Sequence, residues 1–249
     1  MTTMDHQGLI NRLLSFADDE FLLGHRNSEW TGHAPLLEED IAFSNIAQDE
    51  LGHALLWYTI LHEQFELPAP DRLAFWRSAR ECRNAALVEL PRGDWAFTVV
   101  RQYLFDAYEY ARNAVLAQCS YAPIEDAVAK INREEVYHVL HSKGWVLRLG
   151  DATEESHRRM QAALDELWPH ALGLFEPLAD DAEFSSDLAR IQTAWLETVT
   201  PIFTQATLVI PENATPIFGG RTGQHTPHLD GLLADLQKVA RLESPDAIW

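Results

Sequence analysis

The chain has 249 residues, 47% of them hydrophobic, and 38 acidic residues against 19 Lys and Arg, for a net charge of −19. This charge repels a phosphate backbone, so we expect no nucleic-acid partner. Two cysteines are too few for a disulfide framework, and no run of about 18 apolar residues predicts a membrane span. The sequence therefore predicts a soluble, cytoplasmic protein with no membrane partner.

Apolar residues recur at helical spacing along nearly the whole chain, and only "ATLVIP" at 206–211 resembles a strand. Turn-forming stretches such as "NSEWTGHAP", "LPRGD" and "SYAP" separate the helices, and Thr153 is a predicted N-cap. Residues 211–228 predict a long irregular loop, either a partner-docking segment or, as is commoner, a plain surface connection. We predict an all-α protein with helices at 6–26, 36–65, 69–88, 94–119, 123–149, 154–178, 185–208 and 228–242.

Two acid–histidine pairs lie on apolar helix faces: Glu50 with His53, and Glu135 with His138. Buried ionised carboxylates cost several kcal/mol unless they are paired or coordinated. Residues three apart on a helix project side by side, so each pair offers a carboxylate oxygen and an imidazole nitrogen to one metal ion. Trp57 shares the face of the first pair, although inward aromatic side chains more often pack the core.

Glu-x-x-His spacing alone is weak support for a metal site. Glu154 begins the same spacing at a predicted helix start, where the helix dipole explains an acid. A ferritin-like dimetal site also needs one inward glutamate from each of two further helices. Glu20 and Glu109 meet this requirement in the helices that precede the pairs, whereas Asp18 and Asp19 turn away from the shared face.

The two glutamates of each predicted hairpin also lie at matching distances from the turn, measured along the helix axes. In an antiparallel hairpin, residues equidistant from the turn lie at one level. The midpoint between the first two glutamates is Pro35 and that between the other two is Ala122, both in predicted turns. At ~1.5 Å rise per residue, each acid lies about 20 Å from its turn. Four helices are therefore expected to deliver their ligands to one level.

We predict a single ferritin-like domain over residues 1–249. It has a four-helix bundle core at about 6–149, and further helices with a C-terminal loop and helix at about 150–249. A ligand set rich in carboxylates favours iron or manganese over structural zinc, and iron is preferred. The alternative is a buried polar network without metal. The six predicted ligands of two metal ions are Glu20, Glu50, His53, Glu109, Glu135 and His138.

Longer segments carry a more specific resemblance. They are "EWTGHAPLLEEDIAFSNIAQDELGH", "VVRQYLFDAYEYA", "REEVYHVLHSKGWVLRLG", "LW" at 167–168 and "GGRTGQHTPHLDGLLADLQ", of which the last is the most specific. Over nearly its full length the chain resembles the C-type subunits of phenylacetyl-CoA 1,2-epoxidase, the multicomponent oxygenase of aerobic phenylacetate degradation. The related A-type subunits have similar acid–histidine motifs.

The resemblance implies a fold of the bacterial multicomponent monooxygenase type. It also implies pairing with other components, among them the catalytic A-type subunit, with phenylacetyl-CoA as the substrate of the complex. In this family the A-type subunit epoxidises the ring, whereas the C-type subunit is mainly a structural partner whose metal ligands can be degraded. The present sequence departs from that pattern, because all six ligand positions are filled. Turnover of its own, a purely structural scaffold, and a stand-alone manganese catalase or iron-storage protein remain three alternatives.

Overall fold

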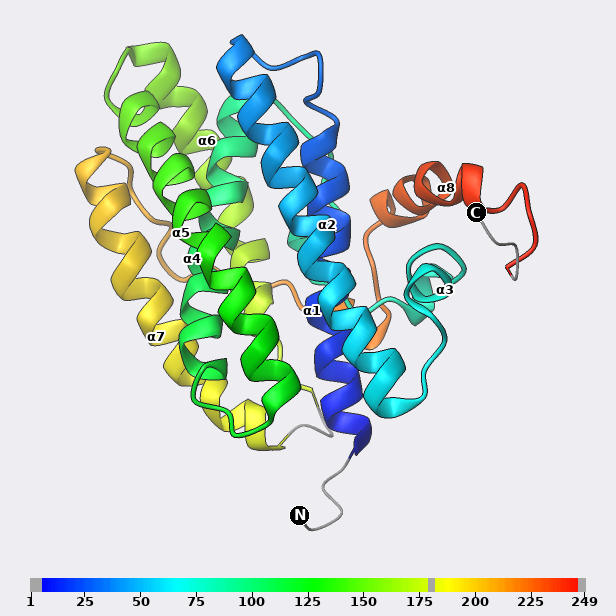
Figure 1. Ribbon diagram of the computed structural model, residues 1–249. Helices are drawn as coiled ribbons and strands as arrows, with labels where there is room; N and C mark the ends of the chain where they lie inside the picture. Colours follow the sequence, from blue (N-terminus) through cyan, green and yellow to red (C-terminus); the bar gives the residue numbers. More distant parts are fainter. Residues whose placement is uncertain (1–5, 179–181, 246–249) are drawn as a thin grey trace. The chain divides into compact units, whose positions relative to one another are not determined.

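The computed structural model describes residues 6–178 and 182–245. Every regular element in these ranges is helical, and no strand occurs in them, so the predicted all-α class is confirmed. Figure 1 shows the α-helices, which are α1 (His6–Ser28), α2 (Leu37–Phe65), α3 (Pro70–Phe75), α4 (Trp95–Leu116), α5 (Ala122–Gly150), α6 (Glu154–Leu172), α7 (Ala182–Gln205) and α8 (His228–Ala240). The short 3-10 helices are η1 (Ala79–Glu81), η2 (Ala86–Val88), η3 (Gly173–Phe175) and η4 (Gly220–Thr222).

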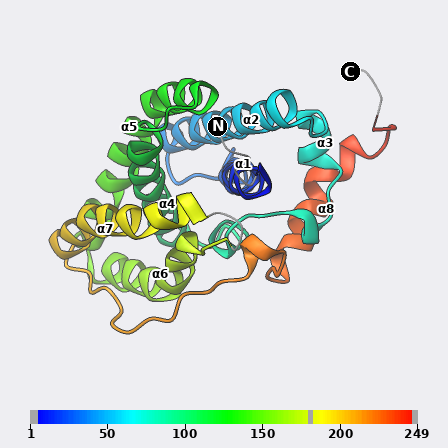
Figure 2. The same ribbon diagram turned by 90° about the horizontal axis from the view of Figure 1, so that it is seen from below.

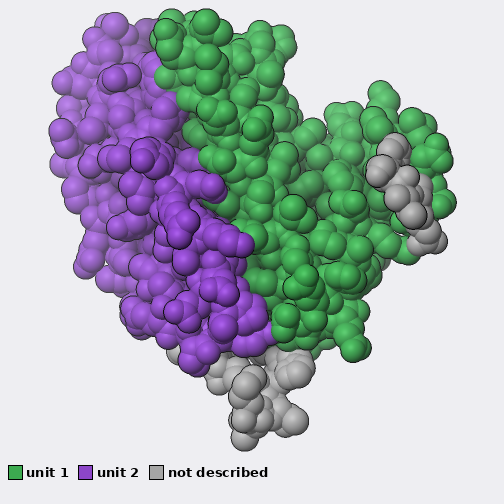
Figure 3. Space-filling model, in the orientation of Figure 1, with its two compact units in different colours: residues 1–91, 178–181, 218–249 green, residues 92–177, 182–217 purple. Residues whose placement is uncertain are grey.

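The chain forms two compact units, coloured separately in Figure 3. Unit 1 comprises Met1–Pro91, Leu178–Asp181 and Phe218–Trp249, and unit 2 comprises Arg92–Pro177 and Ala182–Ile217. The single domain with its bundle core stays a prediction, and its residues 1–5, 179–181 and 246–249 lie outside the described ranges. No helix in the described part of the chain is long and apolar enough to cross a membrane.

In unit 1, α1 and α2 pack side by side as a long hairpin, and α3 packs against α8 (Figure 1). The helix predicted at 69–88 is wrong beyond residue 75, where the chain continues through η1 and η2. Two buried carboxylates on α1 explain the break. Asp18 accepts the backbone N–H of Arg83 at 2.7 Å, and Asp19 accepts that of Ala85 at 2.7 Å. These amides are therefore satisfied without a helix.

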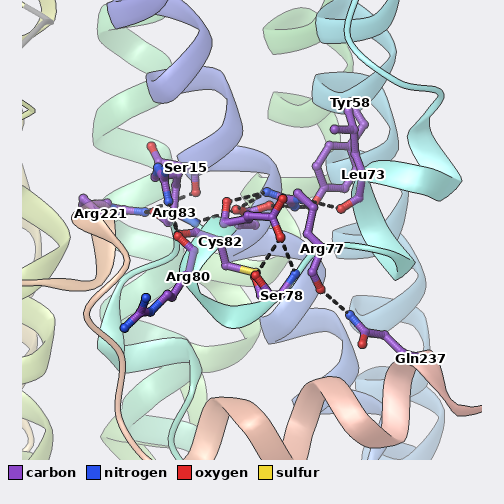
Figure 4. Close-up of polar contacts among 12 residues, drawn as sticks. Ser15, Tyr58, Leu73, Arg77, Ser78, Arg80, Cys82, Arg83, Arg221 and Gln237 are labelled. Atoms are coloured by element: carbon purple, nitrogen blue, oxygen red, sulfur yellow. Dashed lines mark hydrogen bonds and ion pairs between the residues drawn. The ribbon is translucent and has the colours of Figure 1, made fainter.

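A segment from the C-terminal part of the chain, residues 218–226, fastens onto the same region and is here called the strap. It lies within the loop predicted at 211–228 and is irregular apart from η4. Arg221 in the strap is 1% exposed and reaches Asp19 at 2.7 Å. It also donates to the carbonyls of Ser15 and Arg83, labelled with Arg221 in Figure 4. This part of the loop is thus a core tether and not a plain surface connection.

The strap approaches the segment between η1 and η2 so closely that one of its residues must be glycine. A Cβ on Gly220 would lie 2.2 Å from the carbonyl oxygen of Asn84. Gly220→Ala is therefore expected to lower the free energy of unfolding by about 1–3 kcal/mol, as overpacking usually does. Gly231→Ala is the control, because no atom lies within 4 Å of its Cβ position in α8. Urea unfolding should show a small gain for that variant, since alanine favours helices; equal effects of both would contradict the steric argument.

In unit 2, α4 lies among α5, α6 and α7 (Figure 2). Trp195 of α7 is fully buried and donates its indole N–H to the carbonyl of Leu104 at 2.9 Å, which fixes the middle of α4. Thr153 caps α6 as predicted, because its side chain accepts the backbone N–H of Ser156.

The stretch "ATLVIP" forms no strand. Instead, the side-chain amide of Gln161 bonds the backbone N–H and carbonyl of Val209, each at 2.8 Å. These bonds satisfy the backbone groups that a strand would otherwise pair.

Candidate metal centre

Unit 1 carries three of the six predicted ligands in its core. Glu20 of α1 and Glu50 of α2 are fully buried, and His53 is 1% exposed. The indole N–H of Trp57 donates to Glu20 Oε1 at 3.0 Å. The predicted orientation of these three side chains toward the interior is therefore confirmed for this unit.

Glu20 and Glu50 do not lie at one level along the hairpin of α1 and α2, although the sequence predicts that they do. A Cβ on Gly24 would lie 3.1 Å from the Cβ of Glu50, so Glu50 faces Gly24 and not Glu20. The hairpin is centred on Leu37, midway between that facing pair, and not on Pro35. Glu20 is thus offset by about one helical turn, ~5.4 Å. The cause is the connection, because turn residues continue past the end of α1 at Ser28 before α2 begins.

Unit 2 carries the other three predicted ligands. Glu109 of α4 and Glu135 of α5 are fully buried, and His138 is 2% exposed. His138 Nδ1 lies 2.9 Å from Glu135 Oε1. Ligand atoms bound at right angles to one ion at 2.0–2.2 Å are about 3 Å apart. The second Glu-x-x-His pair thus has a spacing that fits two ligands of a single ion and equally fits a hydrogen bond between the two side chains.

A further carboxylate, Asp106 of α4, lies in the same core and was not identified from the sequence. It accepts hydrogen bonds of 2.6 Å from Gln102 and from Ser142 of α5. The sequence feature that could have identified Asp106 is its position three residues before Glu109, which places both side chains on one helix face. Arg112 was missed as well: it is fully buried and donates to Glu109 at 2.5 Å.

Burial is the largest cause of the shifted pKa values of two carboxyl groups in unit 2. It raises the pKa of Glu135 well above the usual range, and the charge of Glu109 raises it further, against the opposing effect of His138. Burial also raises the pKa of Asp106 to about 7, while His138, Ser142 and Gln102 oppose the rise. These carboxyl groups keep their protons at pH values far above their ordinary pKa, and binding of a cation would displace those protons.

The raised pKa of Asp106 predicts a pH-dependent stability. Between its ordinary pKa of 3.8 and about 7, the unfolded chain loses the proton and the folded chain keeps it. Asp106 therefore lowers the free energy of unfolding as pH rises through this window, and the cost stays constant above it. Asp106→Asn should stabilise the metal-free protein by about 2–4 kcal/mol at pH 8 and not at all below pH 4.

Denaturant titrations at several pH values would measure this difference. Asp126→Asn, at an exposed position of α5, is the control and should show no such gain. A pH-independent difference between Asp106→Asn and the parent chain would contradict the assignment.

Each unit thus buries two of the predicted glutamate ligands and one of the predicted histidine ligands, and such acidic and histidine groups could bind a metal ion. The gathering of all six into one centre stays a prediction. An all-helical chain with these buried carboxylates and histidines belongs to the ferritin-like class, in which inward glutamates and Glu-x-x-His motifs build dimetal sites.

Comparison with known proteins narrows this class to one family. The chain belongs to the phenylacetic acid catabolic proteins, whose family model matches residues 1–249. It is 36% identical over 234 residues to the C-type subunit of the 1,2-phenylacetyl-CoA epoxidase of Escherichia coli (strain K12), and the match covers 92% of this chain and 94% of that protein. It is 25% identical over 178 residues to the A-type subunit of the same enzyme, a match that covers 72% of this chain and 57% of that protein. The resemblance predicted from the sequence is confirmed.

Proposed function

We propose that the chain is the C-type subunit of a phenylacetyl-CoA 1,2-epoxidase in aerobic phenylacetate catabolism. It would work in the cytoplasm with the other components of the complex, among them a catalytic A-type subunit. The observation that carries the proposal is the 36% identity to the C-type relative over 92% of the chain, against 25% over 72% to the A-type relative. The chain is therefore more similar to the C-type than to the A-type relative.

We further propose that Glu20, Glu50, His53, Glu109, Glu135 and His138 hold two metal ions. Their burial and their mixture of carboxylates and imidazoles support iron, with manganese as the alternative. When bound, iron would supply the activation of O2 that epoxidation of an aromatic ring requires.

The chain's own residues would bind and orient in this site. The glutamates would hold the ions, and the histidines would complete the ligand sets. Ser142, bonded both to Asp106 and to the carbonyl of His138, fixes the helix turn that presents His138. The full burial of Glu135 excludes bulk water from its carboxylate.

One observation favours a second candidate, a scaffold protein that lacks turnover. The Arg112 guanidinium lies 2.5 Å from Glu109 Oε1, with both side chains fully buried. A buried carboxylate needs a positive partner, and here an arginine supplies it without a metal ion. In that case the six positions would persist for packing of the buried core.

Two measurements test the proposal. The tagged chain, co-expressed with an A-type subunit, should purify as a hetero-oligomer, and the isolated chain should contain about two iron ions per copy by elemental analysis. A hetero-oligomer whose C-type chain is metal-free would support the scaffold. Failure to associate, together with peroxide dismutation or iron storage by the chain alone, would identify a stand-alone dimetal protein instead.

A further inference from the structure

We propose that Trp57 is a positioning residue for Glu20, acting through the hydrogen bond from its indole to that carboxylate. The inference rests on the proposed function, because it assigns Glu20 to a metal. Trp57 itself would not touch the metal or the substrate. It would fix which way the carboxylate of α1 is turned.

The geometry within unit 1 supports this role. Trp57 and Glu20 are both fully buried, and the indole nitrogen lies 3.0 Å from Glu20 Oε1. Phe16, one turn before Glu20 on α1, packs against the indole ring with centroids 5.6 Å apart at 58°. The indole is thus fixed by a ring on the same helix as its acceptor, so the N–H has a set direction.

The chemistry of an indole suits a partner of a metal ligand. Its N–H only donates, so it neither binds a cation nor takes a proton from the carboxylate. A carboxylate oxygen has two lone pairs, so a group that accepts this bond can still bind an ion. Partners that orient metal ligands typically change metal affinity 10- to 100-fold when they are removed.

The next residue of α2 provides a matched comparison. Tyr58 donates its hydroxyl to Asp18 Oδ1 at 2.6 Å and also accepts from Arg77 at 2.9 Å. Two consecutive aromatic residues of α2 therefore donate to two acids of α1, Tyr58 to Asp18 and Trp57 to Glu20. Of these two acids, Glu20 is a predicted metal ligand and Asp18 is not. Tyr58, Arg77 and their surroundings are shown in Figure 4.

The test compares Trp57→Phe with Tyr58→Phe in the full chain, using Co²⁺ as the probe. Each variant removes one buried donor between α2 and α1, and urea unfolding of the metal-free proteins reports the structural cost of each. Equilibrium dialysis against Co²⁺ should show a 10- to 100-fold weaker affinity for Trp57→Phe. The affinity of Tyr58→Phe should stay within a factor of about three of the parent chain.

A second readout separates the N–H from the volume of the ring. In protein with ¹⁵N-labelled tryptophan, the Trp57 indole signal is identified by its loss in Trp57→Phe. Glu20→Gln should shift that signal in metal-free protein, because an amide replaces the carboxyl group that accepts the bond. A signal unmoved by Glu20→Gln, or equal losses of Co²⁺ affinity in both aromatic variants, would overturn the inference. A parent chain that binds no Co²⁺ would overturn the proposed metal site itself.

Discussion

Replacing one ligand in either unit is expected to empty the same pair of metal ions. Glu50→Ala removes a ligand of unit 1 and His138→Ala a ligand of unit 2, and both side chains are at most 2% exposed. If the six residues form one centre, each variant should weaken metal binding on the order of 100-fold or more, since even the partners of metal ligands are worth 10- to 100-fold. Elemental analysis and metal titration of the purified variants measure this loss.

The outcome distinguishes one shared centre from two separate ones. Separate sites would leave each variant with half of the parent's metal and an unchanged affinity for the remainder. Glu154→Ala is the matched control, because Glu154 has the same spacing to a histidine but is exposed at the start of α6. It should keep full occupancy. In the reconstituted complex, undiminished epoxidation by Glu50→Ala and His138→Ala would contradict an essential catalytic site in this chain.

The second large effect is expected at the strap. Arg221→Met removes the guanidinium that lies 2.7 Å from Asp19, where both side chains are fully buried. Breaking a buried ion pair from one side leaves a carboxylate that has lost its charged partner, which typically costs 3–5 kcal/mol. The free energy of unfolding should therefore fall by about 3–5 kcal/mol, measured by urea denaturation under fixed metal conditions.

Two further variants test this reason. The double variant with Asp19→Asn should be less destabilised than the two single changes added together, because the neutral amide no longer needs the arginine. Arg241→Met is the control, since this exposed arginine only donates to backbone carbonyls near α3. A loss of less than about 0.5 kcal/mol for Arg221→Met, as for an ordinary surface change, would refute a tethering role.

The inward faces of the helices could be predicted from the sequence for a simple reason. Apolar residues at helical spacing mark the buried side, and a polar residue among them is carried inward with its neighbours. All six candidate ligands follow this rule, and none is more than 2% exposed. Asp106 follows it too, but the ligand pattern asks for one inward glutamate from that helix, and Glu109 already fills this position.

The residues on the other side of α1 could not be predicted in the same way. Asp18 and Asp19 turn away from the ligand face, a position that usually means solvent. They are buried because groups far along the chain come to meet them, including Arg77 and Arg221. Helical periodicity carries no information about partners that distant. The same two acids hold the backbone of Arg83 and Ala85 and so interrupt a stretch whose local pattern favours a helix.

Asp18, Asp19 and Glu20 are three consecutive buried acids, bonded to Arg77, Arg221 and Trp57 respectively. Successive residues on an α-helix point about 100° apart, so the three side chains fix α1 in rotation as well as in depth. A single residue inserted or deleted between this triplet and the end of α1 at Ser28 would rotate all three acids away from their partners at once. Such a length change should therefore lower the free energy of unfolding by more than any single substitution in the triplet, because three buried acids lose their partners together.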